Sequence, residues 1–387
     1  DEAVSSLNIP ETQRAPLTAV LKDNNELADD IGNAANPTDA AKRYASTEES
    51  IEKTTAVIGD AMNEVANQAT GRLNDLVAAT FAPPVSNQPA GKLKASAPLG
   101  VAAGDASEKF GLWGRVTGGT AQQKTRKLSS AYNSSSFCSV VGIDTMLDDK
   151  TIVGFAVANT SSNVKFKGTK SGDKLKSNSW MFSGYGSYSF YDNFFVRAGL
   201  TASSNKISSR EKRIGDKTGT ANANAKYTAE ALNAEIGVGY NYIASDGGVF
   251  TPSVGLRLTR VNDIEFKETG AGIQNKHVKH KASAKTAALL GAQYTNNVSW
   301  DDMVFTPEAH VNLQYGIGVK TPKGEFKPLS STNMTSYVGQ RAANFAANIG
   351  TSLTTYVDNI EYGAGYDLNL SDKYRGHQGS LKVKIKF

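Results

Sequence analysis

The chain has 387 residues, 39% of them hydrophobic, and a net charge of +5, and its mean hydropathy is −0.37. It contains no run of 18 or more apolar residues, which excludes a bundle of transmembrane helices, and its single cysteine, Cys138, excludes an intrachain disulfide. A transmembrane β-barrel remains open, because barrel strands alternate apolar with polar residues and average to the hydropathy of a soluble protein.

The N-terminal segment is polar and acidic. Residues 1–80 carry 14 acidic and 6 basic side chains, a net charge of −8, which leaves +13 for residues 81–387. Opposite charges on two segments favour contact between them. No secretory signal opens the chain, so we expect a processed product or a piece of a longer protein. Residues 1–46 are predicted to form a tail with at most short helices.

A long amphipathic helix is predicted over residues 47–80. Asn36-Pro37 is a typical helix start, and Ser46-Thr47-Glu48-Glu49 resembles a capping box. Apolar residues then recur at spacings of three and four and form one stripe: Ile58, Met62, Val65, Ala69, Leu73 and Leu76. The opposite face carries Glu52, Asp60, Glu64 and Asp75. Prolines and glycines after the helix mark residues 81–108 as a linker.

From residue 109 onward the pattern has a period of two, which is typical of strands with two different faces. In the last strand Leu381, Val383, Ile385 and Phe387 alternate with three lysines. Strong runs also cover 232–242, 304–317 and 360–370. Weaker ones begin near Phe110, Phe137, Ile152, Trp180, Phe194, Val249, Thr286 and Ala342. We therefore predict an all-β transmembrane fold: an antiparallel β-barrel of about twelve strands over residues 109–387, with the α-helix in or near its lumen.

The predicted connections alternate in length, as short periplasmic turns and long outer loops do in such barrels. Tight turns are expected at 147–150, 190–193, 245–248 and 358–359, and long lysine-rich loops at 119–134, 163–176, 206–225, 263–281 and 319–335. A soluble β-sandwich or antiparallel barrel is the alternative. Tyrosines at strand ends and the aromatic C-terminal residue favour the membrane.

Several motifs carry a resemblance to a known family. The amphipathic helix, Gly111-Leu112-Trp113-Gly114-Arg115-Val116 at the first strand and the terminal aromatic residue resemble the autotransporter β-domain over residues 58–387. More narrowly, Gly142-Ile143-Asp144-Thr145 and Gly376-His377-Gln378-Gly379 are similar to the β-peptide of rickettsial surface cell antigens, especially outer membrane protein B.

This resemblance implies a translocator and anchor of type V secretion in the Gram-negative outer membrane. Its barrel would be inserted by the barrel assembly machinery, which reads the last strand, here Leu381, Val383, Ile385 and Phe387. An N-terminal passenger, in this family often an adhesin linked to bacterial virulence, would be exported to the cell surface, leaving the helix in the lumen. Outer-membrane lipid and lipopolysaccharide would be further partners. An outer-membrane diffusion porin with an N-terminal extension is the alternative function, and a protease or lipase barrel is a third.

Charged residues are expected on the lumen side of the strands. The basic set is Arg115, Arg197, Arg257, Lys382 and Lys384, and the acidic set is Glu235, Glu308, Glu361 and Asp367. We expect a lattice of ion pairs between them that also holds the acidic plug helix through Asp60, Glu64 and Asp75. A solvated helix face is the alternative.

The sequence offers little catalytic chemistry. Some autotransporters release the passenger by cyclisation of a pore-helix asparagine, but Asn63, Asn67 and Asn74 form no Asn-Asn pair, so processing by a separate protease, or none, is expected. The histidines at 277, 280, 310 and 377 lack metal-ligand spacing. We therefore expect no enzyme activity, no catalytic or metal site, no cofactor and no nucleic-acid partner.

Overall fold

The computed structural model describes residues 11–46, 48–81, 110–127, 129–191, 193–300, 303–357 and 359–386. The expected linker, apart from Phe81, lies outside these residues, and so do Phe387 and residues 1–10. The helices are α2 (Glu11–Asp23), α3 (Asn25–Gly32), α4 (Pro37–Ala45), α5 (Glu48–Phe81), η1 (Gly168–Lys170) and η2 (Gly272–Gln274).

The strands are β1 (Phe110–Gln123), β2 (Tyr132–Asp148), β3 (Thr151–Phe166), β4 (Lys174–Phe190), β5 (Phe194–Gly215), β6 (Gly219–Tyr240), β7 (Tyr242–Ile243), β8 (Val249–Val261), β9 (Ile264–Lys267), β10 (Lys276–His280), β11 (Ser283–Thr295), β12 (Val298–Trp300), β13 (Met303–Val319), β14 (Lys323–Pro328), β15 (Thr335–Val338), β16 (Phe345–Val357), β17 (Ile360–Ser371) and β18 (Tyr374–Lys386).

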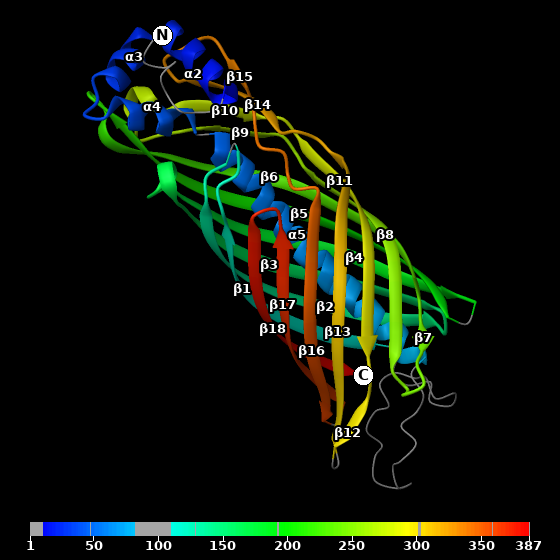
Figure 1. Ribbon diagram of the computed structural model, residues 1–387. Coiled ribbons are helices and arrows are strands. Elements are labelled where there is room, and N and C mark those ends of the chain that lie inside the picture. Colours follow the sequence, from blue (N-terminus) through cyan, green and yellow to red (C-terminus); the bar gives the residue numbers. More distant parts are fainter. Residues whose placement is uncertain are drawn as a thin grey trace.

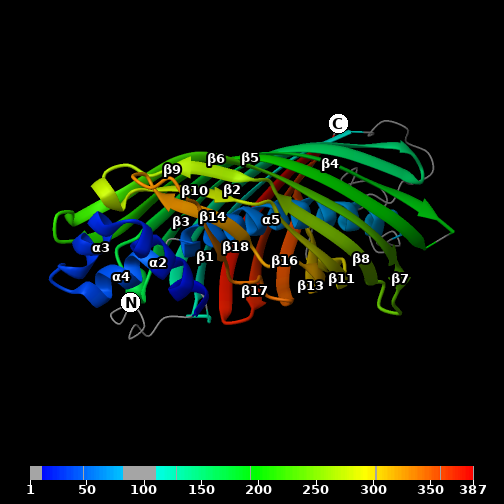
Figure 2. The same cartoon turned by 90° about the horizontal axis from the view of Figure 1, so that it is seen from above.

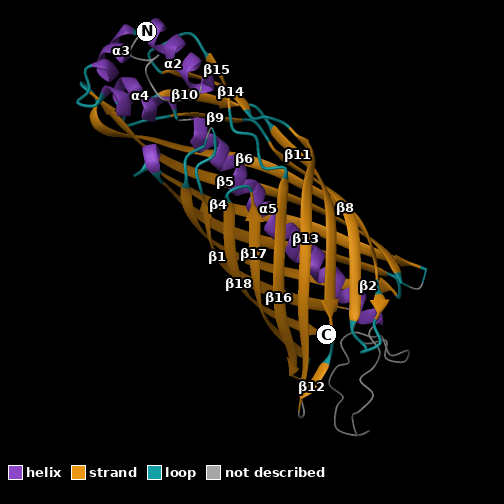
Figure 3. Cartoon of the chain, viewed as in Figure 1, coloured by secondary structure: helices purple, strands orange, loops and turns teal. Residues whose placement is uncertain are grey.

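Within the described ranges, twelve long strands form one closed antiparallel barrel, shown in Figures 1 and 3. Neighbours follow chain order through β6, β8, β11, β13 and β16 to β18, and β18 pairs back onto β1 with Lys386 opposite Gly111. The short strands β7 and β12 only extend the sheet at its margins. Because closure pairs the backbone of every strand, no edge is left to face lipid. The predicted fold is confirmed.

Side chains along the barrel strands alternate between the outer surface and the lumen. On β18, Leu381 and Val383 are 62% and 42% exposed, whereas Lys384 is 2% exposed. The outer surface therefore carries a belt of exposed apolar side chains, among them Phe155, Phe182, Leu200, Ile236, Leu256, Leu290, Ile349 and Leu353. None of the helices in the described part of the chain is both long and apolar enough to span a membrane.

The two ends of the barrel differ. At one end tight turns join the strands, for example between Asp148 of β2 and Thr151 of β3. At the other end β5 and β6, 22 residues each, extend beyond the remaining strands. The chain segments that follow β8 and β13 build a second sheet in the order β15-β14-β10-β9. The expectation of loops at 206–225, 263–281 and 319–335 was therefore wrong.

Helices α2, α3 and α4 lie at this same end and are called the cap below (Figures 1 and 2). Their starts have local causes: the Asn24 side chain accepts from the amide of Leu27, and Asn36 caps α4 ahead of Pro37. Leu17, Leu27, Ile31 and Tyr44 are buried. Residues 11–45 were expected to be a tail with at most short helices; the helices are short, but they pack against β5, β15 and the η1 and η2 turns.

Candidate functional site

The helix α5 runs through the barrel lumen (Figure 1). It has 34 residues, which corresponds to a length of roughly 50 Å. Its apolar stripe, including Ile58, Met62, Val65 and Leu73, is buried and packs against β3 to β6 and β8. The helix is therefore held to one side of the lumen by apolar burial.

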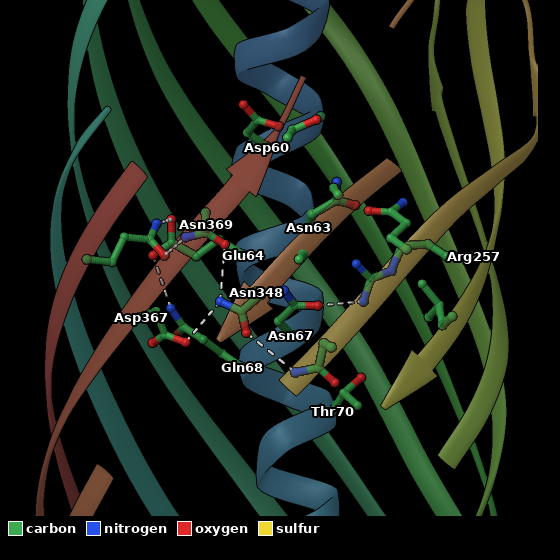
Figure 4. A pocket seen from close by; sticks show the side chains of 18 of the residues that line it. Asp60, Asn63, Glu64, Asn67, Gln68, Thr70, Arg257, Asn348, Asp367 and Asn369 are labelled. Carbon is green, nitrogen blue, oxygen red and sulfur yellow. Dashed lines mark hydrogen bonds between the residues drawn. The ribbon is translucent and has the colours of Figure 1, made fainter. Parts of the chain in front are cut away.

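The polar face of α5 borders a cavity of about 430 Å³ on the other side of the lumen. Asp60, Glu64 and Asp75 line it from the helix, and Figure 4 shows the first two of these together with Asn63, Asn67 and Gln68 on the same helix face. The facing wall comes from β11, β13, β16, β17 and β18. The helix thus fills the side of the lumen where its apolar stripe packs on the barrel wall. The cavity that remains lies on the other side and is lined by polar side chains.

Two of the predicted lumen arginines bind both a wall carboxylate and the helix. Arg257 Nη2 donates to Glu235 Oε2 at 2.5 Å and to Asn67 Oδ1 at 2.6 Å, and the Asn67 contact is drawn in Figure 4. Arg197 Nη1 donates to Asn74 Oδ1 at 2.7 Å and its Nε lies 3.7 Å from Glu235. These asparagine oxygens therefore act as anchors of α5 to the wall.

On the opposite wall only part of the expected lattice forms. Lys382 lies 2.9 Å from Glu361 and 3.5 Å from Asp75 of the helix. Arg115 lies 3.9 Å from Asp367. Within the described residues, Asp60 and Glu64 have no cationic group within 4 Å; Glu64 instead accepts from the amides of Gln68 and Gln378. Lys384 is buried on the lumen side.

The strongest contact between helix and wall was not predicted from the sequence. Arg72 of α5 makes a two-point interaction with Asp144 of β2, at 2.8 Å from Nε and 3.1 Å from Nη2, and both side chains are buried. Here the helix supplies the cation and the barrel the anion, the reverse of the expected arrangement. The inward position of Asp144 could have been found, since Val140 and Gly142 precede it at a period of two and are also buried.

The four histidines all lie in strands. His310 of β13 lies in the lumen between two carboxylates, with Nδ1 3.0 Å from Glu308 and Nε2 3.0 Å from Asp367. His277 and His280, within the loop expected at 263–281, belong to β10, and His377 belongs to β18. The described residues contain no group of three or more side chains suited to a metal ion.

A buried ionic cluster joins the cap to the barrel. Lys276 Nζ donates to the carbonyl oxygen of Tyr44 at 2.6 Å, and Lys170 Nζ to that of Ser46 at 3.0 Å. Arg213 of β5 pairs with Glu211 at 2.8 Å and Glu268 at 3.0 Å. Burial raises the pKa of the Glu268 carboxyl above its usual value, opposed by Arg213.

Asp30 of α3 makes a second junction between the cap and the barrel. Its carboxylate accepts from the backbone and hydroxyl of Thr218, both at 2.8 Å, and from Gln274 Nε2 at 2.7 Å. Although burial works to raise the pKa of Asp30, the hydrogen bonds from Gln274 and Thr218 hold this pKa below its usual value. The cap therefore docks through specific polar contacts as well as apolar burial.

Comparisons with known proteins agree with this architecture. A family model described as the autotransporter beta-domain matches residues 112–367. Outer membrane protein A of Rickettsia conorii is 33% identical over 290 residues, which is 73% of this chain and 14% of that protein. Outer membrane protein B of the same organism is 29% identical over 87% of this chain and 21% of its own length. The chain thus spans a small part of these curated relatives.

Solved structures share the fold at low sequence identity. The translocator domain of the autotransporter NalP from Neisseria meningitidis has a TM-score of 0.58 at 14% identity, over 85% of this chain and 98% of that one. The β-domain of the Bordetella autotransporter BrkA has a TM-score of 0.52 at 15% identity, over 72% of this chain and all of that one.

Proposed function

This chain belongs to the autotransporter β-domain family, and on that premise we propose that it exports an N-terminal passenger and keeps it displayed at the cell surface. It is a translocator domain of the Gram-negative outer membrane, in a family that is not a class of enzymes. The observation that carries the proposal is the course of α5 through the lumen to the capped end. Because tight turns usually face the periplasm, the capped end is the outer one.

Display of an adhesin is the finer part of the proposal. The putative surface cell antigen sca1 of Rickettsia conorii is 28% identical over 74% of this chain and 15% of its own length. A passenger held at the outer end of the barrel by the cap and α5 would likewise be displayed on the cell surface. A diffusion porin would need an open lumen, and the position of α5 favours display over diffusion.

The domain limits and the assembly signal follow the same proposal. Residues 1–46 are the passenger stub, 47–80 the plug helix, 81–108 the linker and 109–387 the translocator. The assembly machinery reads Leu381, Val383, Ile385 and Phe387. The outward exposure of Leu381 and Val383 on the strand that closes the barrel supports this reading.

A reporter experiment tests export. A small epitope-tagged domain is fused ahead of residue 1, behind a secretory signal, and expressed in a Gram-negative host. We expect the tag to be accessible to antibody and protease on intact cells. The matched control, Val383→Asp, is expected to fail to insert because a carboxylate would face lipid. A heat-modifiable, folded barrel whose tag stays in the periplasm would contradict the proposal.

A further inference from the structure

The outer face of β3 to β6 carries a group of exposed cations above the apolar belt. These six residues, called the basic wall, are Lys165, Lys174, Lys176, Lys206, Arg210 and Lys226. Lys165 lies at the end of β3 and Lys174 at the start of β4, and these ends of the strands are the ones nearer the cap (Figure 1). The wall is therefore a continuous surface of sheet and not a set of loop tips.

Strand register brings like charges of the basic wall side by side. Lys174 of β4 is paired directly with Lys165 of β3 on one side and with Arg210 of β5 on the other. Neighbouring strands lie about 4.8 Å apart. Three cations in one row across a sheet repel one another and destabilise it. A bound anion that lies between these cations would offset their repulsion.

No residue of the described chain supplies that anion. Within the described ranges, none of the six has a carboxylate within 4 Å, in contrast to the lumen side of the same strands, where Arg213 pairs with Glu211 and Glu268. The cap does not cover the wall either, because it packs on the inward side of β5, where Arg213 lies beside the ring of Tyr44. The outer cations are open to a partner from outside.

The height of the basic wall indicates where that partner lies. On β4 the outward positions run down from Lys174 and Lys176 to Trp180 and Phe182, which are 53% and 52% exposed. Exposed tryptophan is typical of the membrane interface. At about 3.3 Å per residue and a tilt near 45°, Lys176 lies roughly 9 Å and Lys174 roughly 14 Å above Trp180. This is the level of lipid headgroups.

We infer that the basic wall binds the phosphate groups of lipopolysaccharide in the outer leaflet. The apolar belt would contact the acyl chains while a phosphate bridges adjacent cations, such as Lys174 and Arg210, through charge-assisted hydrogen bonds. The continuity of the wall with the belt on the same four strands favours a membrane lipid over a soluble polyanion. The inference rests on the outer-membrane location and not on passenger export.

Two variants of the full chain and the wild type, all folded in detergent micelles, test this site. The row variant replaces Lys165, Lys174 and Arg210 with serine, which already occupies outward positions on these strands, such as 204 and 208. The control replaces Lys267, Lys281 and Lys323, exposed cations near the second sheet, with serine and so makes the same change in net charge. Retention of fluorescent bisphosphorylated lipid A is compared with that of its dephosphorylated form and with heparin.

We expect the wild type and the control to retain bisphosphorylated lipid A equally and the row variant to bind about tenfold more weakly, as the loss of several phosphate contacts implies. Dephosphorylated lipid A should bind all three proteins equally weakly. Equal retention of the two lipids by the wild type, or equal loss in row and control variants, would overturn the inference. Binding of heparin alone would also overturn it. Heat-modifiable migration and reporter display, measured in parallel, separate this outcome from misfolding and from failure of export.

Discussion

The ammonium group of Lys276 in β10 donates a 2.6 Å hydrogen bond to the carbonyl oxygen of Tyr44, the penultimate residue of α4. The same group lies 3.9 Å from the centre of the Tyr44 ring and 4.3 Å from that of Phe326. A cation at a helix C-terminus satisfies free carbonyls and complements the helix dipole. One buried lysine thus links the cap to the second sheet.

Replacing Lys276 with methionine should loosen the cap. The substitution keeps the length of the side chain but leaves the Tyr44 carbonyl without its buried donor, a loss of about 2 kcal/mol. Hydrogen exchange of the α4 amides should rise accordingly. The control is Lys279→Met on the same strand, whose side chain is exposed, and its effect should stay within about 0.5 kcal/mol. Equal protection of α4 in both variants would disprove the role of Lys276.

Arg72 and Asp144 should form the main ionic anchor of α5. Arg72→Leu leaves the Asp144 carboxylate buried without its cation, at a cost of about 3 kcal/mol, and is expected to raise pore conductance in a planar bilayer. Removing both charges, with Arg72→Leu and Asp144→Asn, should bring the conductance back toward the wild-type value. If the double variant conducts as much as the sum of the single ones, the two residues do not act as a pair.

The acidic residues of the helix should differ in importance. Asp75→Lys opposes the charge of Lys382, 3.5 Å away, so it should increase conductance and shorten closed times. Asp60→Lys makes the same charge change at a position without a cation within 4 Å in the described chain and should do far less. A larger effect from Asp60→Lys would contradict the contacts seen in the lumen.

Acid should loosen the second sheet through His280. This side chain is buried, with Nδ1 3.0 Å from the Tyr337 hydroxyl, and burial lowers its pKa from 6.5 to about 4. The folded state holds the neutral ring, so its stability is complete above pH 6.5 and falls as the pH drops toward 4, by up to about 3 kcal/mol. Hydrogen exchange of β10 and β14 should report this loss.

His280→Gln removes the titrating ring but keeps a polar side chain at the Tyr337 hydroxyl. Once the exchange rates are corrected for the intrinsic pH dependence of amide exchange, the protection of β10 should no longer change between pH 6.5 and 4. His377→Gln, in β18, is the matched control and should retain the wild-type pH response. A pH response that persists in His280→Gln would assign it to another group.

The barrel was predictable because lipid and lumen impose opposite preferences on alternate residues. The run from Leu381 to Lys384 shows this directly, since its exposures alternate as the sequence predicted. The same signal disappears in the upper half of β5. There Ser203, Asn205 and Ser209 face inward beside a single apolar residue, Ile207, while Ser204 and Lys206 face outward. Because polar residues occur on both faces, the alternation is lost and residues from 206 onward were taken for a loop.

The sequence predicts which charged side chains face the lumen, but not which of them pair with one another. The alternation of odd and even positions along each strand indicates which side chains face inward, as for Arg257 and Glu235. The rotation of α5 about its axis, however, depends on how its apolar stripe packs, and this rotation selects Asp144 as the partner of Arg72. The cap carried local signals at Asn24 and Asn36, but its docking depends on Lys276 and Thr218, which are far away in the chain.

The most direct measurement of the central claim is lipid accessibility along β18. In a Cys138→Ser background, single cysteines at 381, 382, 383 and 384 are labelled with a fluorophore and quenched by brominated lipid in proteoliposomes. Strong quenching at 381 and 383 with weak quenching at 382 and 384 is the predicted result. Strong quenching at 382 and 384 instead, or equal quenching at all four positions, would contradict a barrel that presents alternate side chains to hydrocarbon and to an aqueous lumen.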